Sequence, residues 1–162
     1  MNERTRVLLV IHGAGLWISA IAIGWMYMFM LLGEVVLFPI IPSIELAIPG
    51  EARAWNMAHL EGITNGLLLM ALAALAPLLT LTERQGRWLY LSAIITAWGF
   101  TLPAWANALA DTRGLAFDGG PFAGGLANNL IFLSGWPAVL AVHVVFWLVL
   151  KGAFNRLREL RE

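Results

Sequence analysis

The sequence lacks several residue types on which common protein chemistries depend. None of its 162 residues is cysteine, which excludes disulfides, thiolate zinc sites, iron–sulfur clusters and covalently attached c-type haem. Charged residues make up only 12% of the chain, against about 25% in an ordinary soluble domain. Ten basic residues balance ten acidic ones, so nucleic-acid binding has no support. With 60% hydrophobic residues, the composition indicates an integral membrane protein.

Long apolar runs fill most of the chain. A helix needs about 20 apolar residues to cross a bilayer, and the runs predict four spans, at residues 7–33, 62–81, 88–110 and 126–150. The alternating pattern of a membrane barrel is missing. We therefore expect an all-α fold, an integral membrane four-helix bundle in which residues 1–162 form a single domain.

Basic residues orient the spans, because the cytoplasmic flanks of membrane helices are enriched in Lys and Arg. Two arginines precede the first span, two lie between the second and third, and four basic residues follow the fourth. Only Arg53 and Arg113 lie on the opposite side. Both termini are therefore predicted to be cytoplasmic, and the outer connections are residues 34–61 and 111–125.

Polar side chains are costly inside a span, so each is a candidate functional residue. His59, at the outer entrance to the second span, lies too far in depth from His12 and His143 to share one small site with them in a protomer. The polar residues predicted at a similar depth are Glu34, Asn65, Thr101, Asn107, Asn128 and Asn129. The sequence thus predicts a polar site in the outer half, with Asn128 and Asn129 expected to cap the fourth helix.

His59, Gly62 and Gly66 share one face of a helix, because their spacing matches the helical period. A histidine beside two glycines offers a ligand nitrogen next to a flat surface, which is what an axial haem ligand needs. The pattern Gly62-x-x-x-Gly66 is also typical of close helix packing, and the pattern alone favours that interpretation. From the residues alone, both interpretations remain open.

These residues resemble a known family, the styrene oxide isomerases, small four-span membrane enzymes of bacterial styrene degradation. The resemblance covers most of the chain, and its most specific parts are the block around His59 and the turn that starts at Arg113. The matching residues are His12-Gly13, Ile48-Pro49-Gly50, Trp55-x-x-Ala58-His59-x-x-Gly62-x-x-Asn65-Gly66, Pro77, Trp98 and Arg113-Gly114-Leu115-x-Phe117.

The resemblance implies a ferric haem b bound between the protomers of a homotrimer in the bacterial inner membrane, with His59 as the axial ligand of the iron. It also implies that a small lipophilic aryl epoxide is isomerised to an aldehyde, a Meinwald rearrangement. In that reaction a Lewis acid opens the epoxide and a 1,2-hydride shift gives the carbonyl. A dry aromatic cavity would keep water away from the cation.

The same resemblance implies roles for individual residues. Asn65 corresponds to the family's asparagine near the epoxide, whereas Ala104 replaces a family tyrosine that orients it, leaving Thr101 and Asn107 as candidate catalytic substitutes. The residues implied in cofactor binding are His59, Gly62, Gly66, Trp55, Trp98 and Arg113. For Arg113, a haem propionate and a structural ion pair are both open as partners.

Two other functions are compatible with the residues. A b-type electron-transfer protein would pair His59 with a histidine of another chain, or His12 with His143. A small proton-coupled transporter would be built around Glu34, although a carboxylate at the membrane boundary can also simply reach water.

Overall fold

The structure is a computed structural model that describes residues 1–110 and 112–162. Asp111, the first residue of the second predicted outer connection, lies outside the described residues. Within the described part, four long helices account for most of the chain and confirm the predicted all-α four-helix bundle. They are α1 (Glu3–Leu32), α2 (Ala52–Leu75), α3 (Glu83–Leu109) and α4 (Leu126–Glu159). Each is long and apolar enough to cross a membrane.

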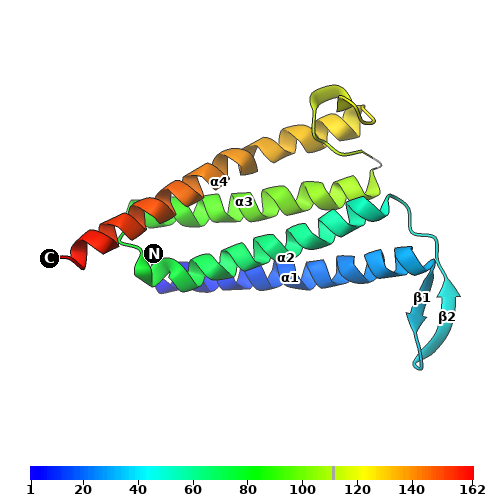
Figure 1. The fold of residues 1–162 in the computed structure, drawn as a ribbon, viewed down its shortest axis with the longest axis horizontal. Helices are drawn as coiled ribbons and strands as arrows, with labels where there is room; N and C mark the ends of the chain where they lie inside the picture. Colours follow the sequence, from blue (N-terminus) through cyan, green and yellow to red (C-terminus); the bar gives the residue numbers. More distant parts are fainter. Residues whose placement is uncertain (111) are drawn as a thin grey trace.

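Short elements connect the helices. The strands β1 (Glu34–Leu37) and β2 (Ile41–Glu45) form an antiparallel hairpin after α1, in which Glu34 lies opposite Glu45. The 3-10 turn η1 (Ala76–Leu78) follows α2, and the turn η2 (Phe117–Gly119) lies in the connection between α3 and α4. Both chain termini lie at one end of the bundle, and the hairpin and the α3–α4 connection lie at the other (Figure 1). We call these the inner and outer ends.

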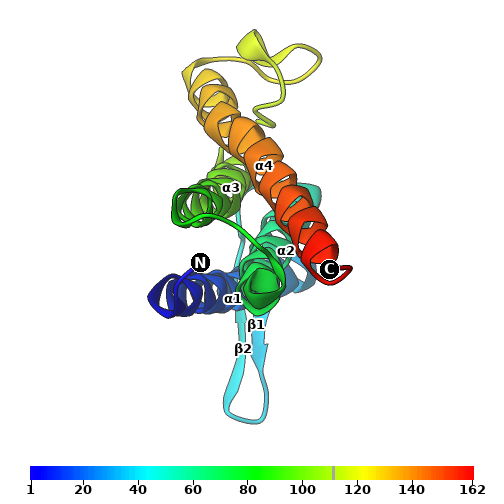
Figure 2. The same cartoon turned by 90° about the vertical axis from the view of Figure 1, so that its left-hand side faces the viewer.

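The helices pack in sequence order, α1 on α2, α2 on α3 and α3 on α4. Viewed from the inner end, the hairpin projects beyond α1 and α2, while the α3–α4 connection lies on the opposite side of the outer end (Figure 2). Many large apolar side chains on the four helices are exposed, among them Ile18, Leu140 and Trp147. Exposed apolar side chains of this kind suit contact with lipid in a membrane-spanning bundle.

Small residues allow α1 and α2 to approach closely. A Cβ atom added at Gly62 would lie 2.8 Å from the Cβ of Ala20, and one at Gly66 would lie 2.9 Å from the carbonyl oxygen of Gly13. Gly62 and Gly66 are both buried. Within one chain, the structure therefore shows close helix packing at the Gly62-x-x-x-Gly66 pattern. A role of these glycines in cofactor binding stays a prediction.

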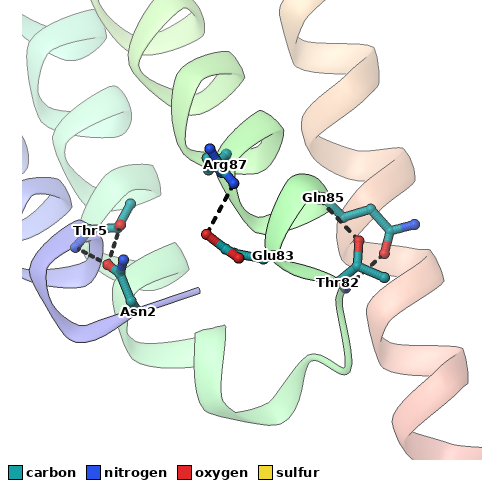
Figure 3. Close-up of polar contacts among 6 residues, drawn as sticks. All are labelled: Asn2, Thr5, Thr82, Glu83, Gln85 and Arg87. Atoms are coloured by element: carbon teal, nitrogen blue, oxygen red, sulfur yellow. Dashed lines mark hydrogen bonds and ion pairs between the residues drawn. The ribbon is translucent and has the colours of Figure 1, made fainter.

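Side-chain caps stabilise the starts of α1 and α3 at the inner end. Thr82 and Gln85 form a reciprocal capping box at the start of α3, with distances of 3.3 and 3.0 Å (Figure 3). Asn2 caps α1 by accepting from the backbone N–H of Thr5 at 2.9 Å. Such caps satisfy backbone donors that have no partner inside the helix.

The second helix begins before the apolar run predicted as its span. It runs from Ala52 to Leu75, whereas the apolar run covers residues 62–81. The helix includes the charged residues Arg53 and Glu61, and the span bounds themselves stay a prediction. The α-helix ends at Leu75 and continues directly into the 3-10 turn η1, which contains Pro77. His59 lies two turns after the first residue of α2.

Candidate active site

A cavity of about 580 Å³ lies at the outer end, between α2, α3, α4 and the connection that follows α3. Aromatic and small side chains form much of its wall. Among them are Phe100 and Ala104 of α3 and Phe132 and Trp136 of α4. A volume of this size is in the range of small-molecule sites, so the cavity can hold an aromatic substrate of moderate size.

The connection between α3 and α4 forms one side of the cavity and is held by Asn128. The Asn128 side-chain oxygen accepts from the Thr112 hydroxyl at 2.8 Å and the Gly114 N–H at 3.1 Å, and its amide donates to the carbonyl of Ala116 at 2.8 Å. The expectation that Asn128 and Asn129 cap α4 is wrong. Gly125 occupies the cap position with no side-chain hydrogen bond, because the asparagines lie in the helix and bond to the preceding loop instead.

Arg113 and Asn107 meet at the same side of the cavity. The Asn107 amide donates to the carbonyl oxygen of Arg113 at 3.1 Å, while the Asn107 side-chain oxygen is buried without a hydrogen-bond partner among the described residues. The Arg113 guanidinium lies 3.5 Å from the Glu51 carboxylate and 4.8 Å from the ring centroid of Phe122. The sequence left a haem propionate and a structural ion pair open as partners of Arg113. Within the chain, the structure shows the ion pair with Glu51.

Asn65 and Thr101, which the sequence places at equal depth, are in contact. The Asn65 amide nitrogen donates to the Thr101 hydroxyl oxygen at 3.1 Å and to the Glu61 carboxylate at 2.9 Å. The Thr101 hydroxyl in turn donates to the carbonyl of Ala97 at 2.7 Å. Both predicted residues are buried, and Glu61 is the member of this network that lines the cavity.

Glu61 is a residue to which sequence analysis assigned no role. Its position four residues before Asn65 is the signal that could have found it, because residues at i and i+4 are neighbours on a helix. The sequence could not show that the same side of α2 faces a cavity.

His59 lies on another side of α2, facing α1. Its Nδ1 is 2.8 Å from the carbonyl oxygen of Ala20. Because a carbonyl oxygen only accepts, this contact requires the proton on Nδ1, and in a neutral imidazole the lone pair is then on Nε2. The ring occupies space that a side chain at residue 24 would fill, since a Cβ added at Gly24 would lie 2.7 Å from its Cε1 atom. His59 is half-buried.

Two predicted cofactor residues, Trp55 and Trp98, serve contacts within the chain. Trp55 is buried and its indole donates to the carbonyl oxygen of Pro49 at 2.9 Å, which ties α2 to the preceding loop. Trp98 donates to Nδ1 of His12 at 3.2 Å and lies edge-to-face with Trp105, with ring centroids 6.3 Å apart. Neither is among the residues that line the outer cavity.

Four apolar helices, with an outer cavity that has aromatic side chains in its wall and a buried hydrogen-bond network beside it, are the features of a multi-pass membrane protein with room for a small molecule. The sequence model of a family described as styrene oxide isomerase matches residues 5–154. A styrene-oxide isomerase of Pseudomonas fluorescens is 28% identical over 126 residues, which cover 74% of this chain and 75% of that protein.

The chain belongs to the styrene oxide isomerase family, which confirms the resemblance seen in its motifs. It is an isomerase, and its class of reaction is the isomerisation of epoxides. Family membership favours this function over electron transfer and over transport. Glu34 begins β1, just past the end of α1, at the outer boundary where the sequence placed it.

Proposed function

We propose that this protein isomerises aryl epoxides similar to styrene oxide to aldehydes, with a ferric haem b bound through His59. The observation that carries the proposal is the hydrogen bond from Nδ1 of His59 to the carbonyl of Ala20. Histidines that bind metals commonly donate the N–H of their other ring nitrogen to a backbone carbonyl, which fixes the tautomer and the orientation of the ring. The half-buried imidazole therefore suits an axial haem ligand.

When bound, a ferric haem supplies a Lewis acid that polarises the epoxide oxygen. The chain itself contributes the medium of the reaction. Phe100, Phe132 and Trp136 form an aromatic wall that would orient the aryl ring and limit the access of water. This matters because water would trap a benzylic cation as a diol, whereas a 1,2-hydride shift converts it to the aldehyde without any gain or loss of atoms.

His59 and the cavity lie on different sides of α2. His59 contacts Ala20 of α1, whereas the cavity side carries Met57 and Glu61. Within one protomer, α2 itself therefore lies between the proposed haem ligand and the proposed substrate site. We propose that the enzyme is a homotrimer, in which the cavity of one protomer faces His59 of the partner subunit.

We further propose that the protein lies in the bacterial cytoplasmic membrane with both termini inside, and that it acts in styrene degradation. The distribution of basic residues supports the orientation. Because the chain has no cysteine, a single cysteine added at either terminus would be the only thiol. Labelling of intact cells with a membrane-impermeant maleimide should leave both terminal thiols unmodified, and modification of either would contradict this orientation.

The central test combines a visible spectrum with an activity assay. We expect the purified protein to show the absorption of a ferric haem that responds to added ligands, and to convert styrene oxide to phenylacetaldehyde without oxygen. His59→Ala should lose both properties. His143→Ala is the matched control, because His143 is exposed and its Nδ1 only contacts the carbonyl of Val139 in its own helix. A colourless wild-type protein would overturn the haem assignment, and an inactive one the proposed reaction.

A further inference from the structure

The carboxylate of Glu61 occupies a distinctive place in the outer cavity. Of the two glutamates that line it, Glu51 is paired with Arg113 at 3.5 Å. Glu61 forms no ion pair with any basic side chain in residues 1–110 and 112–162. One of its oxygens accepts from Asn65 at 2.9 Å, and the other has no hydrogen-bond partner in that part of the chain.

Each hydrogen bond in the network behind Glu61 has a defined donor and acceptor. The Thr101 hydroxyl donates to the Ala97 carbonyl, so towards Asn65 it acts as an acceptor. Both polar contacts of the Asn65 side chain use its amide nitrogen, one to Thr101 and one to Glu61. Asn65 is 7% exposed and Thr101 is fully buried, and neither lines the cavity. The member of the network that lines the cavity is Glu61, whose carboxylate is the terminal group of the network.

Electrostatic catalysis depends on fixed charges placed where charge develops in the transition state. In the proposed rearrangement the electron pair of the benzylic C–O bond moves to oxygen, and the benzylic carbon becomes positive. A hydride then moves with its electron pair from the neighbouring carbon to the benzylic carbon, and the carbonyl forms. A carboxylate beside this carbon stabilises the positive charge without gaining or losing an atom.

We propose that Glu61 is a catalytic residue of this isomerase, and that its carboxylate stabilises the positive charge that develops on the epoxide carbon. Asn65 and Thr101 are then positioning residues that act through Glu61. This inference rests on the proposed function and deepens it. It also changes the role of Asn65 and Thr101, which the sequence predicted to be catalytic themselves.

Glu61→Gln tests the charge while it preserves shape, because the glutamine oxygen can still accept from Asn65. We expect kcat for styrene oxide to fall about 10- to 100-fold, with KM changed by less than about threefold. The loss should be larger for a para-nitro substrate than for a para-methyl substrate, since the nitro group withdraws electrons and leaves the cation more dependent on the protein. An unchanged kcat, or an equal loss across the substituted substrates, would overturn the role of Glu61.

A double-mutant cycle tests the positioning role of Asn65. Asn65→Ala should lower kcat in the wild-type background but have little further effect in the Glu61→Gln background, because residues that act as a unit are not additive. If Asn65 contacts the substrate directly, the two losses will multiply instead, and the positioning role is overturned.

The controls separate a failed inference from a failed function. The haem spectrum and the elution volume of Glu61→Gln should equal those of the wild type. Glu83→Gln is the matched glutamate control, since Glu83 only pairs with Arg87 at the inner end, at 3.0 Å. An active wild type with a fully active Glu61→Gln overturns the role of Glu61 alone. A wild type that does not isomerise epoxides overturns the proposed function together with it.

Discussion

His59 of α2 is held by Ala20 of α1 through a hydrogen bond of 2.8 Å from its Nδ1 to the backbone carbonyl. Because the acceptor belongs to the backbone, no side-chain substitution at residue 20 removes it. The orientation of the ring instead depends on how closely α1 and α2 approach at this depth. Gly24 allows that approach, since a side chain there would meet the imidazole.

The first prediction concerns Gly24. Gly24→Ala should displace the His59 ring, because the new Cβ would lie 2.7 Å from Cε1 and 2.8 Å from Nδ1. We expect a loss of haem per protomer and a destabilisation of about 1–3 kcal/mol from overpacking, measured by absorbance and by denaturant titration. Gly15→Ala is the control in the same helix, because nothing lies within 4 Å of its added Cβ. Full haem content in Gly24→Ala would show that the ring is not constrained in this way.

A second prediction concerns the size of the cavity. Ala104→Phe should reduce the free space within the volume of about 580 Å³ that Ala104 lines. The value of kcat/KM for the bulky stilbene oxide should therefore fall at least about tenfold relative to that for styrene oxide, measured by chromatography of the carbonyl products, an aldehyde from styrene oxide and the ketone that a hydride shift gives from stilbene oxide. Equal changes for the two epoxides would mean that the substrate does not occupy the space beside Ala104.

A third prediction follows from the arrangement of sites in a trimer. His59→Ala and Ala104→Trp, which fills the cavity, should each be inactive alone. If His59 of the partner subunit completes each site, every mixed trimer has one intact site, and its activity should be about one third of the wild-type value by cyclic symmetry. The measurement uses co-expressed variants with two different affinity tags. Complete inactivity of purified mixed trimers would place the whole site within one protomer.

The fourth prediction concerns the loop that lines the cavity. Asn128→Ala removes hydrogen bonds to Thr112, Gly114 and Ala116. Leaving these partners unsatisfied should lower the free energy of unfolding by about 1–3 kcal/mol and raise KM. Asn129→Ala is the comparison, because its bonds to Asp118 are exposed and should matter less. Equal stability of the two variants would argue against a special role of Asn128.

Much of the fold follows from the sequence because membrane spans are defined by composition. Hydropathy locates the four helices, and α2 begins before the apolar run that marks its predicted span, since the helix includes the charged residues Arg53 and Glu61. Helix length there is determined by backbone hydrogen bonding and not by apolarity.

The candidate site was predictable in part. Depth alone predicted that Asn65 and Thr101 could meet, and the structure shows them in contact. Which side of α2 each residue faces was not predictable, because Gly62-x-x-x-Gly66 suits either a cofactor or a neighbouring helix. The side of α2 that faces a neighbouring helix is determined by the packing of α1 against α2. That packing depends on which helices are neighbours, which the sequence does not give. For the same reason the sequence could not show that Glu61 faces the cavity.

The loop fixed by Asn128 has a consequence for how the substrate concentration should be expressed. It lines the outer end of a cavity whose other walls are the apolar helices α2, α3 and α4. An aryl epoxide of the proposed kind dissolves in acyl chains, so most of the substrate around such helices would be held in lipid. The apparent KM, expressed as total substrate per volume, should then rise as more lipid is added, and it should be constant when expressed as substrate per mole of lipid. The bilayer would then be the reservoir of the proposed substrate, and oil–water partitioning would be part of the specificity.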